Sequence, residues 1–195
     1  MRVLGAVIAG GHSRRMGGQE KALLDLGGIT LLERVISRIA PQVDEVIINA
    51  NGDPARFTMF GRSVIADMMA TGTPLAGLHA ALRHGQRHGH DAVLTVPSDA
   101  PFLPLNLVGR LADAGSHTGA VVAASLGQTH HLTGLWSSAM ADKLEELLAA
   151  GRLRRMMDLS EVFAVEVAEW EVDPVDPFLN INTPDDLALA LRCLT

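Results

Sequence analysis

Residues 3–21 have the sequence VLGAVIAGGHSRRMGGQEK, in which an apolar run leads directly into a glycine-rich, basic segment. The apolar part, residues 3–9, is short and nearly continuous, as expected for a strand buried in a parallel sheet. Glycines after a strand let backbone N–H groups approach a phosphate, and two arginines and a lysine supply charge for a polyphosphate. The spacing matches neither the common NTPase loop, because no Ser or Thr follows Lys21, nor the dinucleotide fingerprint. The stretch therefore predicts a phosphate-binding loop of a different class, rather than a flexible basic surface loop.

Downstream of this loop, strand-like apolar runs alternate with segments of helical periodicity. Strands are predicted at residues 45–49, 64–66, 92–96, 119–124 and 131–136, with an edge strand at 162–167. Helices are predicted at residues 30–40, 75–87, 104–114 and 139–150. The last helix has a clear start, because Thr183 can cap it, Pro184 suits its first position and Asp186 follows three residues after the cap. The β-α-β-α order predicts one three-layer α/β domain over residues 1–195, with a mostly parallel sheet.

Composition limits the class of protein. The chain of 195 residues is 48% hydrophobic and 19% charged, as in globular proteins, and its net charge of −6 disfavours non-specific nucleic-acid binding. No segment approaches the ~18 apolar residues of a membrane span. The apolar start gives way to Gly10 and Gly11 without a cleavage site, and one cysteine, Cys193, cannot form an internal disulfide. We therefore expect a cytoplasmic protein that binds neither nucleic acid nor a membrane.

Polar side chains follow the predicted strands at the edge where α/β sheets bind ligands, beyond the carboxyl ends of the strands. Asp99 follows the fourth strand, and a carboxylate there, facing a cationic phosphate loop, is well placed to hold Mg²⁺. Asp67 follows the third strand and is a second acidic contributor, a hydroxyl acceptor or an ordinary turn aspartate. Asn49 ends the second strand and offers a donor and an acceptor to a nucleobase or ribose, whereas Asn51 with Gly52 is an ordinary turn signal. These side chains are the candidates for a nucleotide site.

Six segments, spread from end to end of the chain, have the order and spacing of one known family. They are residues 8–21, 49–51, 65–67, 73–77, 97–101 and 178–187. Together they resemble the molybdenum cofactor guanylyltransferase family. The first segment alone is similar to the broader class of nucleotidyltransferases, and Asn180 and Asn182 before Thr183 and Pro184 make the resemblance specific. Glu20 departs from the family, which usually has Asp before the lysine.

The resemblance implies a Rossmann-like nucleotidyltransferase fold, whose N-terminal half binds the nucleotide and whose C-terminal part binds the acceptor. It implies transfer of GMP from GTP to the terminal phosphate of molybdopterin, with release of pyrophosphate. The implied GTP-binding residues are Ile8, Ala9, Gly10, Gly11, Lys21, Asn49, Asp67 and Asp99. The implied catalytic residues are Arg15, Lys21 and Asp99, with Mg²⁺ on Asp99. The implied molybdopterin-binding residues are Asn180, Asn182, Arg154 and Arg155, and the implied partners are cofactor-biosynthesis proteins and recipient molybdoenzymes, in transient contacts.

The implied reaction joins two anions, so charge neutralisation and alignment are expected to do most of the catalytic work. A phosphate nucleophile needs no general base, because its second pKa of about 6 leaves it ionised at neutral pH. Three alternatives stay open: a cytidylyltransferase for the same acceptor, a sugar-1-phosphate nucleotidyltransferase, and a nucleotide-binding regulatory module. A regulatory module has no need for Asp99 or the asparagine pair, and a sugar-phosphate enzyme usually carries an additional segment. Gly10 and Gly11, with residues 74–77, resemble the guanine-using branch.

Overall fold

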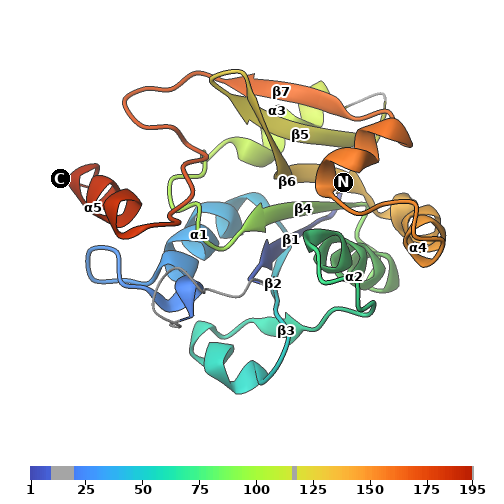
Figure 1. Cartoon of the computed structure of the whole chain (residues 1–195), viewed down its shortest axis with the longest axis horizontal. Helices are drawn as coiled ribbons and strands as arrows, with labels where there is room; N and C mark the ends of the chain where they lie inside the picture. The colour runs from blue at the N-terminus through green and yellow to red at the C-terminus, as the bar shows by residue number, and fades with distance from the viewer. Residues whose placement is uncertain (10–19, 116–117, 195) are drawn as a thin grey trace.

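The computed structural model describes residues 1–9, 20–115 and 118–194, which form a seven-stranded sheet with helices on both faces (Figure 1). The strands are β1 (Val3–Ile8), β2 (Glu45–Asn49), β3 (Ser63–Ile65), β4 (Ala92–Pro97), β5 (Ala120–Ser125), β6 (Gln128–Ser137) and β7 (Glu166–Trp170). The α-helices are α1 (Leu31–Ile39), α2 (Pro74–Arg87), α3 (Leu107–Ala114), α4 (Ala141–Ala149) and α5 (Pro184–Arg192). Short 3-10 helices are η2 (Lys21–Leu23), η3 (Ala40–Gln42), η4 (Pro54–Phe60), η5 (Ser138–Met140) and η6 (Met156–Glu161).

The strand order is β3-β2-β1-β4-β6-β5-β7. Parallel pairs join β3 to β2, β2 to β1, β1 to β4 and β5 to β7. Among the described strands, β6 alone runs antiparallel to its neighbours, β4 and β5. The prediction of an α/β fold with a mostly parallel sheet is confirmed.

Each face of the sheet buries its own apolar layer. All six residues of β1 are buried, and they alternate between the two layers. Val3 and Val7 pack in the layer that contains α1 and α3, whereas Leu4 and Ala6 pack in the layer that contains α2 and α4. Full burial of an aliphatic side chain stabilises a fold by roughly 1.5–3 kcal/mol. The continuous apolar run of the first strand is therefore explained by helices on both sides of it.

The strand β6 extends beyond the residues predicted for it, 131–136, at both ends. It folds back from β5 through Leu126 and Gly127, whose φ angles of 52° and 71° suit a two-residue hairpin turn. The buried indole of Trp136 then donates a hydrogen bond of 2.8 Å from Nε1 to Thr95 Oγ1, which itself donates to the carbonyl of Leu132 at 2.8 Å. These bonds join β6 to β4, so the long hairpin lies inside the sheet, between β4 and β7, rather than at its edge.

The predicted edge strand at 162–167 is wrong in position, because β7 covers Glu166–Trp170 and pairs with β5. The preceding residues follow η6, and there Phe163 and Val165 pack against the layer of α2 and α4 without joining the sheet. Their apolar alternation reflects this packing. The capped start of the last helix is confirmed, since Thr183 Oγ1 accepts a bond of 3.2 Å from the Asp186 N–H. Within the described ranges, no helix is long and apolar enough to cross a membrane.

Candidate active site

The carboxyl ends of β3, β2, β1 and β4 lie side by side at one edge of the sheet. Backbone hydrogen bonds continue there, from the Ala9 N–H to the Asn49 carbonyl at 2.8 Å and from the Ser98 N–H to the Ile8 carbonyl at 3.2 Å. The chain passes to one side of β1 to form β2 and to its other side to form β4, and open α/β sheets bind ligands at such a switch point. The structure brings five predicted site residues to this edge: Ile8, Ala9, Asn49, Asp67 and Asp99.

Lys21 connects the sheet edge to the C-terminal segment. Its ammonium group forms an ion pair with Asp99 Oδ2 and donates a hydrogen bond of 2.6 Å to Asn182 Oδ1. The Lys21 side chain is 20% exposed and that of Asp99 is 16% exposed, so water screens the pair only partly. A cation, a carboxylate and an amide from three distant parts of the chain therefore meet at one point.

The second oxygen of Asp99 has no hydrogen-bond donor among the described residues. Asp99 Oδ1 is buried and accepts no hydrogen bond from the residues that the structure describes. A buried carboxylate oxygen without a donor is costly, and a metal ion would satisfy it. Mg²⁺ takes one or two carboxylates, with phosphate oxygens and water completing its shell. The Asp99 carboxylate thus fits a metal that binds together with a triphosphate.

Two asparagines hold the Asp67 carboxylate in place. The buried Asn49 amide donates to Asp67 Oδ1 at 3.0 Å, and the Asn51 amide donates to Asp67 Oδ2 at 2.7 Å. The Asp67 N–H in turn donates to Asn51 Oδ1 at 2.9 Å. Asn51 was missed as a site residue because its Asn-Gly context is an ordinary turn signal. Its two-residue spacing from Asn49 is the signal that could have found it.

The start of α2 approaches this cluster closely at Gly77. A Cβ atom at Gly77 would lie 2.5 Å from Asn49 Oδ1 and 3.2 Å from Ile8 Cγ2. Because Asn49 is also bound to Asp67, its side chain cannot move aside without breaking that bond. Glycine at this position therefore lets α2 pack against the ends of β1 and β2.

The predicted acceptor asparagines lie on the segment that precedes α5. The Ile181 N–H donates to the Asp99 carbonyl at 2.9 Å, which places Asn180 and Asn182 on either side of this contact. The Asn182 N–H donates to Asp186 Oδ2 at 2.9 Å. Backbone hydrogen bonding from Asn182 holds the pKa of Asp186 below its usual range. The capping carboxylate of α5 thus also orders the residue that contacts Lys21.

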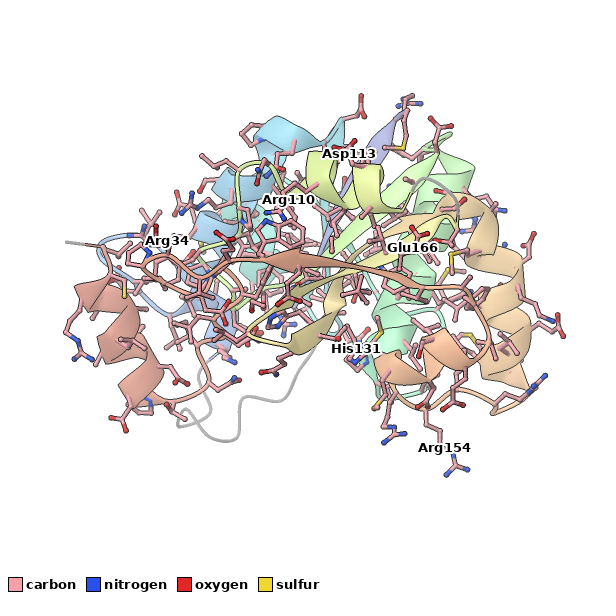
Figure 2. All side chains as sticks on the ribbon, turned by 90° about the horizontal axis from the view of Figure 1, so that it is seen from above. Arg34, Arg110, Asp113, His131, Arg154 and Glu166 are labelled. Carbon is pink, nitrogen blue, oxygen red and sulfur yellow. The ribbon has the colours of Figure 1, made fainter. Side chains whose placement is uncertain are left out.

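The two predicted acceptor arginines lie elsewhere, just before η6. Backbone N–H groups of Arg154 and Arg155 each donate to Asp158 Oδ2 at 2.9 Å, which lowers the pKa of Asp158. The Arg155 side chain also binds Asp158, whereas the exposed Arg154 side chain projects outward on the same side of the molecule as His131 (Figure 2). Within the described residues, no hydrogen bond or ion pair joins either arginine to the asparagine pair.

Three predicted residues, Gly10, Gly11 and Arg15, lie outside the described residues. Glu20, which follows them, forms an ion pair of 3.3 Å with Arg56 Nη1. Arg56 also donates from Nη2 to the Asn51 carbonyl at 2.6 Å. Arg56 thus connects Glu20, at the end of the glycine-rich segment, to η4 and to Asn51. No sequence motif indicated this connection.

Comparisons with known proteins agree with this geometry. Residues 5–166 match the family described as MobA-like NTP transferase domain. The chain is 42% identical over 193 residues to the molybdenum cofactor guanylyltransferase of Nitrobacter hamburgensis, covering 96% of this chain and 92% of that protein. It is 45% identical over 190 residues to that of Cereibacter sphaeroides, covering 97% and 96%. The crystal structure of molybdopterin-guanine dinucleotide biosynthesis protein A from Archaeoglobus fulgidus is similar, with a TM-score of 0.75 and 25% identity over 98% of each chain.

The similarity spans both the sheet edge that carries Asn49, Asp67 and Asp99 and the C-terminal segment, since more than nine-tenths of the chain is covered. It confirms the resemblance that six short segments of sequence indicated. The chain belongs to the molybdenum cofactor guanylyltransferase family, and its domain is a nucleotidyltransferase domain.

Proposed function

We propose that this guanylyltransferase transfers GMP from GTP to the terminal phosphate of molybdopterin and releases pyrophosphate. The observation that carries the proposal is the position of Lys21, which contacts Asp99 at the nucleotide edge and Asn182 in the C-terminal segment. Identity of 42% and 45% to proteins named molybdenum cofactor guanylyltransferase supports the choice of nucleotide and acceptor. The N-terminal half of the chain then binds GTP, and the C-terminal part binds molybdopterin.

The nucleotide is bound by Ile8, Ala9, Gly10, Gly11, Lys21, Asn49, Asp67 and Asp99. Repulsion between negative charges is the main barrier to joining two anions. Lys21 and Arg15 lower this barrier by stabilising negative charge on the transferring and leaving phosphates. In the free protein, the Lys21 ammonium is already partly desolvated beside Asp99. A triphosphate that enters the site therefore meets a cation that needs little rearrangement.

The metal is held by Asp99. Its Oδ1, which accepts no hydrogen bond from the described residues, supports this assignment, and we take the metal to be Mg²⁺ because carboxylate and phosphate oxygens are its usual ligands. When bound, Mg²⁺ neutralises charge on the triphosphate. Lys21 forms an ion pair with Oδ2, the other oxygen of the same carboxylate. This ion pair holds the Asp99 side chain in position.

The acceptor is bound by Asn180, Asn182, Arg154 and Arg155. The hydrogen bond from Lys21 to Asn182 supports a role for the two asparagines in acceptor binding. It brings the segment that carries them to the group that stabilises the transferring phosphate. Exposure of the Arg154 guanidinium supports a role in binding an anionic acceptor. We further propose that the protein acts in the cytoplasm, with transient contacts to cofactor-biosynthesis proteins and recipient molybdoenzymes.

The test is pyrophosphate release by the purified protein with Mg²⁺ and molybdopterin, comparing GTP with CTP and ATP. Release that needs molybdopterin, prefers GTP and is lost in Asp99→Ala is the expected result. Preference for CTP would keep the mechanism and assign a cytidylyltransferase. Absence of release with every nucleotide, given an acceptor that a related enzyme can use, would overturn the proposal in favour of a regulatory or sugar-phosphate role.

A further inference from the structure

The acceptor asparagines lie at the end of a long segment without helix or strand. Residues 171–183 run from the end of β7 to the start of α5, and Asn180 and Asn182 lie near its end. Such a segment has high conformational entropy unless other parts of the protein hold it. Its contacts therefore decide whether the two asparagines have a defined position.

One hydrogen-bonded cluster holds the middle of this segment to the β5–β6 hairpin. Ser125, the buried last residue of β5, donates from Oγ to Asp176 Oδ1 at 2.8 Å. The same carboxylate oxygen accepts the Phe178 N–H at 2.9 Å. Ser125 Oγ lies 2.7 Å from His130 Nε2 on β6. Three elements thus converge on one hydroxyl and one carboxylate.

The direction of these bonds excludes nucleophilic chemistry by the serine. The single hydroxyl proton of Ser125 is given to Asp176, so His130 must donate its own proton from Nε2 to Ser125 Oγ. In a catalytic triad the histidine lies between the serine and the carboxylate and accepts the serine proton. Here the serine lies in the middle. The cluster has the connectivity of a structural clamp.

Phe178 adds an apolar contact to the clamp. Its side chain is 2% exposed, with ring centroids 4.7 Å from His130 and 5.2 Å, edge to face, from Trp170. Three residues later, the Ile181 N–H binds the Asp99 carbonyl at 2.9 Å. Asn180 therefore lies between two fixed points, and Asn182 follows the second of them. Among the described residues, no hydrogen bond joins the clamp to the nucleotide-side residues Asn49 and Asp67.

We propose that Ser125 and Asp176 are positioning residues for the acceptor, because they hold the segment that carries Asn180 and Asn182. The inference rests on the proposed function. Loss of the Asp176 carboxylate leaves a buried hydroxyl and a backbone N–H without their acceptor, and the segment gains freedom. The KM for molybdopterin should then rise by about tenfold or more, because losing hydrogen bonds to a charged group costs more than losing hydrogen bonds between neutral groups. The KM for GTP should change by less than about twofold, because the nucleotide edge keeps its contacts.

The experiment compares Asp176→Ala, Ser125→Ala and Asp176→Asn with the wild type. An asparagine oxygen can still accept from Ser125 and Phe178, so Asp176→Asn should restore most of the affinity for molybdopterin. Glu171→Ala, which removes an exposed carboxylate from the same segment, is the matched control and should leave both KM values unchanged. KM for each substrate and kcat are measured by pyrophosphate release.

A second readout does not depend on activity. Amide hydrogen exchange at Phe178 and Ile181 should become faster in Asp176→Ala, while exchange in β1 and β4 stays as in the wild type. Slow exchange in those strands also shows that the variant is folded. Unchanged exchange at Phe178 and Ile181, or an equal rise in both KM values, would overturn the inference. Lack of activity in the wild type itself would overturn the proposed function and leave the exchange result to test the clamp.

Discussion

Lys21 and Asn182 are 161 positions apart in the chain, yet Lys21 Nζ donates a hydrogen bond of 2.6 Å to Asn182 Oδ1. The same ammonium group binds Asp99, so a single side chain contacts both halves of the proposed site. Binding of a triphosphate and ordering of the acceptor segment should therefore be linked through Lys21.

Lys21→Met keeps an unbranched chain of similar length and removes the charge. We expect it to lower kcat on the order of 100–1,000-fold, which is the usual effect of losing one well-aimed charged group. Lys21→Arg keeps the charge but not the geometry and should retain part of the activity. Steady-state pyrophosphate release measures both variants. A Lys21→Met enzyme within a few-fold of the wild-type kcat would show that Lys21 only orders the free protein.

Gly77→Ala should disturb the nucleotide edge. The new Cβ would lie 2.5 Å from Asn49 Oδ1, so Asn49 must shift and weaken its bond to Asp67. We expect a loss of about 1–3 kcal/mol in the free energy of unfolding, as for other overpacked sites, and a higher KM for GTP. Denaturant unfolding and GTP titration measure the two effects.

Gly109→Ala is the matched control for this change. Gly109 also lies in a helix, α3, and a Cβ there meets no atom within 4 Å. Replacement of glycine by alanine in an open helical position stabilises a protein by about 0.4–1 kcal/mol. A loss of stability in both variants would mean that the close contact at Asn49 is not the cause.

The stability of the α5 cap should depend on pH through Asp186. Hydrogen bonding from the backbone of Asn182 lowers the pKa of this carboxyl in the folded protein. Such a group stabilises the fold at pH values above its unfolded pKa, about 3.9, and this contribution is lost as the pH falls through the folded pKa. We expect Asp186→Asn to lower the free energy of unfolding by about 0.3–1 kcal/mol at pH 7, the usual value of a carboxylate at a helix start.

Urea unfolding of wild type and Asp186→Asn at several pH values measures this difference. The two curves should start to approach each other below about pH 3.9, the unfolded pKa, and should meet once the pH has passed the lower folded pKa of Asp186, where the carboxyl is neutral in both states. Asp185→Asn, one position earlier and more exposed, is the control and should change stability less. A constant difference from pH 7 to pH 3 would show that the carboxylate charge does not stabilise the cap.

The ion pair between Glu20 and Arg56 should contribute little to stability. Both side chains are partly exposed, at 26% and 34%, and such pairs usually contribute about 0.2–1 kcal/mol. Glu20→Asp shortens the side chain by one methylene and should weaken the pair while leaving kcat within about threefold of the wild type. A double-mutant cycle of Glu20→Gln and Arg56→Gln measures the coupling. Coupling well above 1 kcal/mol would point to a larger role for the pair in holding Glu20 beside η4.

Local sequence was sufficient for the parts of the fold whose signals are themselves local. The apolar run before Gly10 predicted β1, and Thr183 with Asp186 predicted the start of α5, because strand burial and helix capping depend on neighbouring residues. The edge at which Asn49 and Asp99 meet followed from the general rule for parallel sheets. The residue roles assigned there stay predictions.

Features that depend on distant residues could not be predicted in this way. The direction of β6 and the position of β7 follow from pairing with β5, which leaves no local mark in residues 162–167. The bonds from Ser125 to Asp176 and from Glu20 to Arg56 join side chains 51 and 36 positions apart in elements that only the folded sheet brings together. Arg154 and Arg155 were grouped with the asparagines by family resemblance, and their surroundings in the structure are those of η6.

The contact between Phe178, Ile181 and the body of the sheet has a consequence for synthesis of the protein. A chain still attached to the ribosome could form β1 to β4 early, because all four strands precede residue 98. Asp99 would then be present without Ile181 beside it, and Lys21 would be present without Asn182. The acceptor side would form only when the last residues leave the exit tunnel, so a nascent or C-terminally truncated chain should hold the nucleotide edge without a competent partner for it.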